Sequence, residues 1–356
     1  MNEETRINNS LNKKKWIYCP SCGTKLPEIE RQKYCMKCGL DLELIKLKRI
    51  TESSTILRSE RMTYKKKIQD KISDEEILNL GEKKLWNSLA SIGIPLAAFI
   101  LMNLIAFVTI IFFMFFVVNL EDLINIILSP YFVIVSSFIE LIFILVPVIY
   151  IRKYLQSSKL SNRLALLGFS SRGYNNLGIL KEVLLGLGFA ISAIFLVFFV
   201  SLFMELLLEL IFGIDIVSSA GVSLNEIDVI IANSDILAII LLILTMVIII
   251  GPSEEILFRG FMQKGLVKNI GKIWGIIITA VLFSFIHLIG IFVMAYDTLI
   301  EYVVSFLLNF FPYFAISLLL GLLFYWRKEN LIAVTITHGF YNSITIILAY
   351  LYFSYV

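Results

Sequence analysis

Residues 236–262 read ILAIILLILTMVIIIGPSEEILFRGFM. The stretch is longer than the roughly 20 apolar residues that a helix needs to cross a bilayer, and its first half is almost wholly apolar. It nevertheless carries Glu254, Glu255 and Arg259. Ionisable side chains inside a membrane are energetically expensive and usually mark a functional site. We therefore predict a membrane helix that carries a polar functional site.

The chain contains only two histidines, His287 and His338, and both lie in apolar segments downstream of this stretch. The first ends the motif Phe283-Ser-Phe-Ile-His287, and the second begins the motif His338-Gly-Phe-Tyr-Asn342. Residues four apart lie on one face of a helix. Each motif is therefore expected to present both of its end residues to the same neighbour.

The composition predicts an all-α integral membrane protein. Of the 356 residues, 58% are hydrophobic and 17% are charged, whereas soluble domains carry about a quarter charged residues. The mean hydropathy is +0.84. We predict seven transmembrane helices, and six or eight stay open because residues 292–301 could enter the membrane interface. The predicted spans are 91–118, 130–151, 183–212, 236–262, 273–292, 302–326 and 331–354.

The charge pattern predicts the orientation. Residues 1–88 hold 19 Lys and Arg against 13 Asp and Glu, and residues 89–356 hold 12 against 15. Beyond residue 88, every basic residue lies in one set of alternate connections or at the adjoining helix ends, at 152–181, 259–272 and 327–328. By the positive-inside rule these connections are cytoplasmic. We therefore expect a multi-pass protein of the cell membrane with a cytoplasmic N-terminus.

The four cysteines predict a structural metal site. They form Cys19-Pro-Ser-Cys22-Gly and Cys35-Met-Lys-Cys38-Gly. Two such thiolate pairs suit tetrahedral zinc, and four cysteine ligands leave no open position for catalysis. Two disulfides in an exported head are the alternative, which a cytosolic placement opposes. The segment resembles the small zinc-ribbon modules and is expected to hold structural Zn²⁺.

These features divide the chain into a polar tail (1–18), a zinc ribbon (19–40), a basic juxtamembrane linker (41–88) and a transmembrane domain (89–356). A basic segment before a membrane span is attracted to anionic lipid headgroups. Nucleic acid is a disfavoured partner, since few aromatic residues interleave with the charges. The ribbon is a candidate module for binding a cytosolic protein.

Helix geometry predicts that the polar residues meet. If 236–268 and 273–292 form a hairpin turning near Asn269–Gly271, Glu254 and His287 each lie about 24 Å from the turn. They can therefore face each other at one depth. His338 lies about 12–15 Å inside the border marked by Arg327, so it can reach the same pocket.

The two adjacent glutamates are expected to differ. Glu255 and Arg259 are four residues apart, so an ion pair between them would leave Glu254 free as a base. Arg259 could also extend towards the nearby cytoplasmic border. Gly251-Pro252 should loosen or kink the helix just before the pair, because proline removes a backbone hydrogen bond.

These residue types predict hydrolysis of an amide bond. A carboxylate beside a neutral imidazole, as in Glu254 with His287, can hold a water molecule and accept its proton. An imidazole with an amide, as in His338 with Asn342, can donate hydrogen bonds to an oxyanion. Two histidines and a glutamate also match the ligand count of catalytic zinc. The His-Glu-x-x-His segment of common zinc proteases is absent, and both mechanisms stay open.

At these residues the chain resembles the CPBP family of intramembrane proteases, the CAAX-processing and bacteriocin-related family also called Abi. The resemblance covers roughly residues 180–356 and rests on the three motifs in their order. It implies a membrane protease of eight or fewer helices, metal-dependent or glutamate-dependent, acting on a polypeptide that is lipidated or membrane-embedded. The implied catalytic residues are Glu254, Glu255, Arg259, His287, His338 and Asn342.

A non-catalytic membrane protein is the alternative, one that binds a peptide or confers bacteriocin immunity. The intact motif set favours the enzyme. One further ionisable residue, Glu140, lies midway along the second predicted span. We expect a protonated side chain hydrogen-bonded to a neighbouring helix, with a role in proton transfer as the alternative.

Overall fold

The computed structural model describes residues 85–355 except 118, 156–158, 173, 222–229 and 294–295. The predicted ribbon with its four cysteines, and nearly all of the basic linker, lie outside the described residues. The chain divides into two units. The first comprises Met1–Lys84, Arg152–Leu166 and Ser171–Tyr174, and the second, here called the membrane unit, comprises Leu85–Ile151, Leu167–Ser170 and Asn175–Val356.

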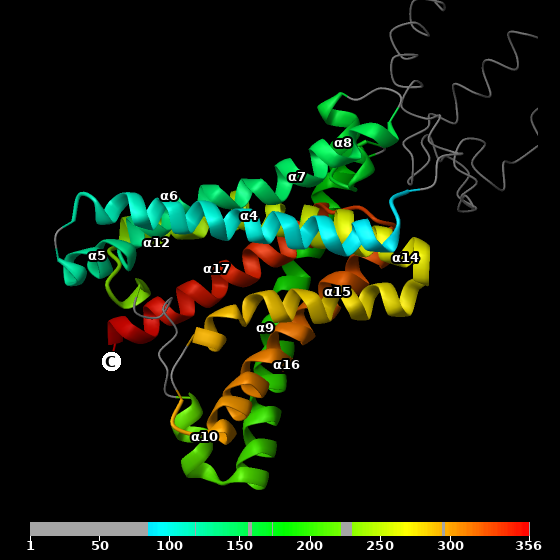
Figure 1. Cartoon of the computed structure of the whole chain (residues 1–356). Coiled ribbons are helices and arrows are strands. Elements are labelled where there is room, and N and C mark those ends of the chain that lie inside the picture. The colour runs from blue at the N-terminus through cyan, green and yellow to red at the C-terminus, as the bar shows by residue number, and fades with distance from the viewer. Residues whose placement is uncertain are drawn as a thin grey trace, which may run out of the picture. The chain divides into compact units, whose positions relative to one another are not determined.

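All regular structure in the described residues is helical, as predicted (Figure 1). The membrane unit begins with α4 (Ser88–Met114), α5 (Leu120–Ile127), α6 (Pro130–Ser136), η2 (Ser137–Leu141) and α7 (Ile142–Tyr150). It continues with α9 (Asn176–Phe212), α10 (Ile214–Gly221), α12 (Ile236–Thr245), η4 (Met246–Ile250), α13 (Gly251–Glu255), η5 (Ile256–Gln263) and α14 (Lys264–Ile270). It ends with α15 (Lys272–His287), η6 (Ile289–Val293), α16 (Leu299–Trp326) and α17 (Ile332–Tyr355). Between α7 and α9 lie η3 (Ile151–Tyr154) and, in the first unit, α8 (Leu160–Leu166).

Six helices in the described part of the chain are long and apolar enough to cross a membrane. They match six of the seven predicted spans. The remaining one, predicted at 273–292, is wrong in length, because α15 has 16 residues and ends at His287. A short 3₁₀ turn, η6, follows it. The histidine therefore lies at a helix end, not within a continuous span.

The stretch from Ile236 to Ile270 forms one long helix at the centre of the membrane unit. It contacts α17, α7, α4 and α15, while α9 packs against both α17 and α16. Figure 1 shows α4 beside the α6–α7 helix, and α9 and α16 running together towards α10. At Gly271, which has a φ of +89°, the chain turns back into α15, as the predicted hairpin requires.

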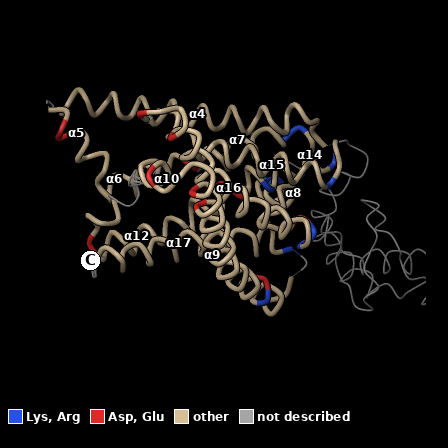
Figure 2. Tube along the Cα trace, turned by 90° about the horizontal axis from the view of Figure 1, so that it is seen from below, with Lys and Arg blue, Asp and Glu red and all other residues tan. Residues whose placement is uncertain are grey.

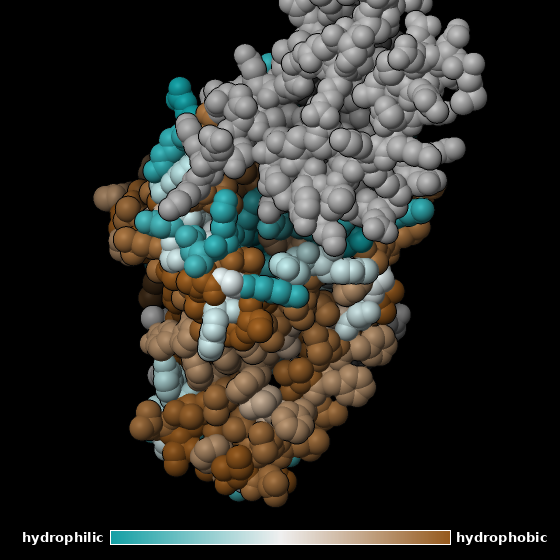
Figure 3. Space-filling view, turned by 90° about the vertical axis from the view of Figure 1, so that its right-hand side faces the viewer, coloured by the Kyte–Doolittle hydropathy of each residue, from teal (hydrophilic) through white to brown (hydrophobic). Residues whose placement is uncertain are grey.

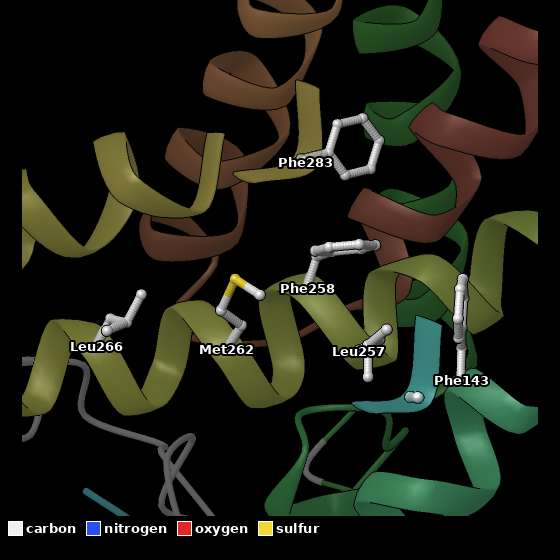
Figure 4. Close-up of a cluster of buried hydrophobic side chains, with 7 residues drawn as sticks. Phe143, Leu257, Phe258, Met262, Leu266 and Phe283 are labelled. Carbon is white, nitrogen blue, oxygen red and sulfur yellow. The ribbon is translucent and has the colours of Figure 1, made fainter. Parts of the chain in front are cut away.

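The central helix is held by a buried apolar cluster, drawn in Figure 4. Its members come from five elements of the membrane unit: Ala98, Phe143, Leu257, Phe258, Met262, Leu266 and Phe283. Every residue of η5 is buried. The cluster therefore fixes the rotation of the central helix next to α15, which carries His287.

The outer surface of the membrane unit is strongly apolar. Large hydrophobic side chains on α4, α9 and α12 are widely exposed, as expected for lipid contact, and Figure 3 shows such a surface on one face. Figure 2 shows basic residues gathered near α14 and acidic residues near α5. This separation agrees with the predicted alternation of charge. The side that faces the cytoplasm stays a prediction.

Two glycines allow α17 to approach the central helix closely. A Cβ atom at Gly339 would lie 2.8 Å from the Cα of Val247, and one at Gly251 would lie 3.2 Å from the backbone nitrogen of Gly339. The two backbones are therefore in contact at this point. This contact brings His338, the neighbour of Gly339, against the glutamates of α13.

We predict that Gly339→Ala destabilises the protein by about 1–3 kcal/mol, because the added methyl group overpacks a backbone contact. Gly188→Ala on α9 is the matched control. A Cβ there meets nothing within 4 Å, and alanine favours a helix by roughly 0.5–1 kcal/mol. Thermal unfolding of the purified variants in detergent should show a lower Tm for the first and an equal or higher Tm for the second. Equal melting of Gly339→Ala and wild type would contradict the close contact.

Candidate active site

The central helix widens on both sides of the two glutamates. The turns η4 and η5 are π-helical, and the Gly251 amide donates to the Met246 carbonyl, five residues back. Such widened turns are rare and occur frequently at functional sites. They surround Pro252, which has no amide to donate. The predicted disturbance of the helix is therefore a local widening, and the helix continues through it.

Glu255 is the centre of a buried ion network. Its Oε1 accepts a hydrogen bond from Nη1 of Arg259 at 2.8 Å and another from Nδ1 of His338 at 2.7 Å. Glu255 and Arg259 are both fully buried. The ion pair predicted from their i, i+4 spacing is therefore present, and it also holds a histidine from α17.

Arg259 points into the protein. Its Nη2 donates to the Ser317 hydroxyl at 2.8 Å, and its guanidinium lies 4.5 Å from the centre of the Phe283 ring. Of the two alternatives predicted for Arg259, the ion pair is present and the extension towards the membrane border is not. Leaving the buried Glu255 without a partner costs more than burying a well-bonded pair, which explains the inward position.

Glu254 is placed differently from its neighbour. Its Oε2 lies 3.7 Å from Nε2 of His287 and 3.7 Å from Nε2 of His338. These separations exceed hydrogen-bond length, and Oε2 has no hydrogen-bond partner among the described residues. A polar contact of this length is one that a water molecule can bridge. The predicted meeting of Glu254 with both histidines is confirmed.

The partners of the two imidazoles define which nitrogens face Glu254. Nδ1 of His287 lies 2.8 Å from the Phe283 carbonyl, which can only accept, so this nitrogen carries the proton. Nδ1 of His338 donates to the carboxylate of Glu255 in the same way. In a neutral ring Nε2 then has a free lone pair. Both histidines therefore direct Nε2 towards one carboxylate oxygen.

Asn342 lies one turn beyond His338, and its amide donates to Sδ of Met246 at 3.8 Å. No hydrogen bond among the described residues joins Asn342 to Glu254 or Glu255. The structure thus brings together five of the predicted residues: Glu254, Glu255, Arg259, His287 and His338.

The residues around Glu254 offer a carboxylate and two imidazoles, which are donor types that zinc accepts. Within the described ranges, no group of three or more His, Cys, Asp and Glu side chains is arranged to hold a metal ion.

Two residues of α16 contact the site but were not predicted from the sequence. Ser317 supports Arg259, and the Tyr313 ring lies 4.9 Å from the His287 ring. Both are polar residues in a largely apolar helix, and Tyr313 follows a helix-internal proline, Pro312. These signals are weak, because only the fold shows which face of α16 meets α15.

Glu140 also belongs to this region. It lies in η2, which packs against η4 and α13, and it interacts electrostatically with Glu254. Its buried Oε2 forms no hydrogen bond within the part of the chain that the structure describes. This oxygen therefore does not make the expected bond to a neighbouring helix, and a role in proton transfer stays a prediction.

The family model described as type II CAAX prenyl endopeptidase Rce1-like matches residues 236–344. The matched segment is similar to that family and covers less than half of the chain. The match contains all three motifs, so the resemblance to the CAAX-processing membrane proteases is confirmed over a narrower range than the predicted 180–356. The family implies a protease. No curated protein and no solved structure matches the chain significantly.

We predict that Arg259→Met destabilises the protein by about 3–5 kcal/mol, because it leaves Glu255 buried without its cationic partner. The double variant Glu255→Gln/Arg259→Met removes both charges. It should therefore have a higher Tm than Arg259→Met alone. A double variant that melts below the single variant would show that Glu255 is not an unpaired charge in the single variant.

Proposed function

We propose that the protein is an intramembrane endopeptidase that hydrolyses a peptide bond near the cytoplasmic membrane face. One observation carries the proposal: Glu254 is buried, and its Oε2 faces Nε2 of both histidines without a hydrogen-bond partner among the described residues, whereas Oε1 of Glu255 is bonded to Arg259 and His338. A carboxylate beside two oriented imidazoles suits acid–base hydrolysis.

In this proposal, water bound between Glu254 and Nε2 of His287 attacks the scissile carbonyl carbon. Glu254 takes the proton of the water molecule as the new carbon–oxygen bond forms. His287 is held for this task by its bond to the Phe283 carbonyl, which fixes the ring and leaves Nε2 as an acceptor. The pair therefore orients the nucleophile and removes its proton.

The oxyanion of the tetrahedral intermediate is assigned to His338 and Asn342. As an imidazolium, His338 donates one N–H to Glu255 and has the second, on Nε2, for the oxyanion. The Asn342 amide would exchange its contact with the Met246 sulfur for the substrate, since sulfur is a weak acceptor. Glu254 then returns its proton to the leaving nitrogen as the carbon–nitrogen bond breaks.

The family match supports a substrate of the CAAX type, a polypeptide that is prenylated or otherwise held at the membrane. We propose membrane lipid as the surroundings of the helices and the cytoplasm as the location of the N-terminus. The ribbon, with structural Zn²⁺ on its four cysteines, is proposed to bind a cytosolic protein.

The direct test is cleavage of quenched fluorescent peptides by the purified full-length protein in detergent. The peptides end in Cys-aliphatic-aliphatic-X, with and without a prenyl group, alongside a random quenched library. We expect wild type to cleave, and Glu254→Ala and His338→Ala to lose at least about 100-fold in kcat. Glu205→Ala, at an exposed position of α9, is the matched carboxylate control and should retain activity. Equal turnover in wild type and both site variants would contradict catalysis and favour peptide binding without cleavage.

The zinc proposal has its own measurement. Elemental analysis of the intact protein should find about one zinc per chain, and the Cys19→Ser/Cys22→Ser variant should lose it. If the variant instead retains zinc that disappears on His287→Ala, the metal lies at the catalytic residues. That result would replace the glutamate-type mechanism by a metal-dependent one.

A further inference from the structure

Tyr313 lies on the open side of the site. It is 37% exposed, and the neighbouring His287 side chain is 24% exposed. Glu254 and His338 on the other side are only 11% and 6% exposed. Tyr313 and His287 are therefore more accessible than Glu254 and His338.

The Tyr313 ring covers one face of a catalytic imidazole. The ring centres of Tyr313 and His287 are 4.9 Å apart, with 32° between the planes. The centre of the His287 ring also lies 4.2 Å from the centre of the Phe283 ring, with 33° between the planes. The imidazole thus contacts one aromatic ring of its own helix and one from α16. Such aromatic contacts stabilise the orientation of a ring beyond the effect of its buried area.

The Tyr313 side chain lies near groups on two further helices. It interacts electrostatically with Glu254 of α13 and with Tyr341 of α17. No hydrogen bond of this hydroxyl to a described residue is present. A phenol whose ring contacts the catalytic imidazole therefore has a donor available for substrate.

We propose that Tyr313 is a further catalytic residue: its ring positions His287, and its hydroxyl donates a hydrogen bond to the scissile carbonyl oxygen. The proposal rests on the peptidase function proposed above and adds a donor from α16. The donor differs from His338 in one respect, because a phenol donates without carrying a charge. Its bond strengthens as negative charge develops on the oxygen, so it acts on kcat more than on KM.

Three variants separate the two roles of Tyr313. Tyr313→Phe keeps the ring and removes the hydroxyl, and Tyr313→Leu removes both. Tyr302→Phe is the matched control, since it lies on the same helix and contacts Phe292 and Tyr296 but neither histidine. Each is measured as full-length protein for kcat, KM and Tm, with a peptide that wild type cleaves.

We expect Tyr313→Phe to lose about 10- to 100-fold in kcat, at an unchanged Tm and with KM within about twofold. Tyr313→Leu should lose about tenfold more, because His287 is no longer held. Tyr302→Phe should match wild type. A Tyr313→Phe variant with wild-type kcat overturns the donor role. Equal kcat for the Phe and Leu variants overturns the positioning role.

The outcome also distinguishes this proposal from the function beneath it. If wild type cleaves and Tyr313→Phe is fully active, only the donor role of Tyr313 fails. If a change in KM alone accompanies Tyr313→Phe, the hydroxyl binds ground-state substrate and the catalytic assignment is overturned. If wild type and Glu254→Ala are equally inactive towards every peptide, both proposals fail.

Discussion

Arg259 is a cation buried completely inside a membrane protein, and its neutralisation determines how four helices meet. Its guanidinium binds Glu255 on its own helix, Ser317 on α16 and the face of Phe283 on α15. Glu255 in turn receives Nδ1 of His338 from α17. A buried charge without such partners costs several kcal/mol, so the arrangement of these helices is strongly constrained. The contact of Gly339 with the central helix supplies the close approach that the network needs.

The network also makes two adjacent glutamates chemically different. Glu255 is held as a structural carboxylate, because its Oε1 accepts from both Arg259 and His338. Glu254 forms no ion pair with the arginine among the described contacts, and its Oε2 lies 3.7 Å from Nε2 of each histidine. The same fold therefore holds one carboxylate as support and leaves its neighbour as the base. In the proposed reaction this difference directs water to a single carboxylate oxygen.

Local spacing predicted most of the site, and long-range packing determined the rest. The i, i+4 pair Glu255–Arg259 and the equal depth of Glu254 and His287 follow from helix geometry, and both are present. The contacts of Ser317 and Tyr313 depend on the rotation of α16, which no local pattern fixes. The same limit explains why the sequence left two alternatives open for Arg259. The length of α15 was overestimated because hydropathy continues through η6, whereas the helix ends at His287. The roles of the ribbon cysteines remain predictions outside the described residues.

The central claim is that Glu254 and the two histidines converge on one scissile carbonyl while Glu255 stays with Arg259. The most direct measurement is an experimental structure of the full-length Glu254→Gln variant with a bound, uncleaved peptide that wild type cleaves. The account predicts the scissile carbonyl carbon beside residue 254 and His287, with its oxygen within hydrogen-bond distance of Nε2 of His338. A peptide bound away from these residues, or a metal ion joining the two Nε2 atoms, would contradict it.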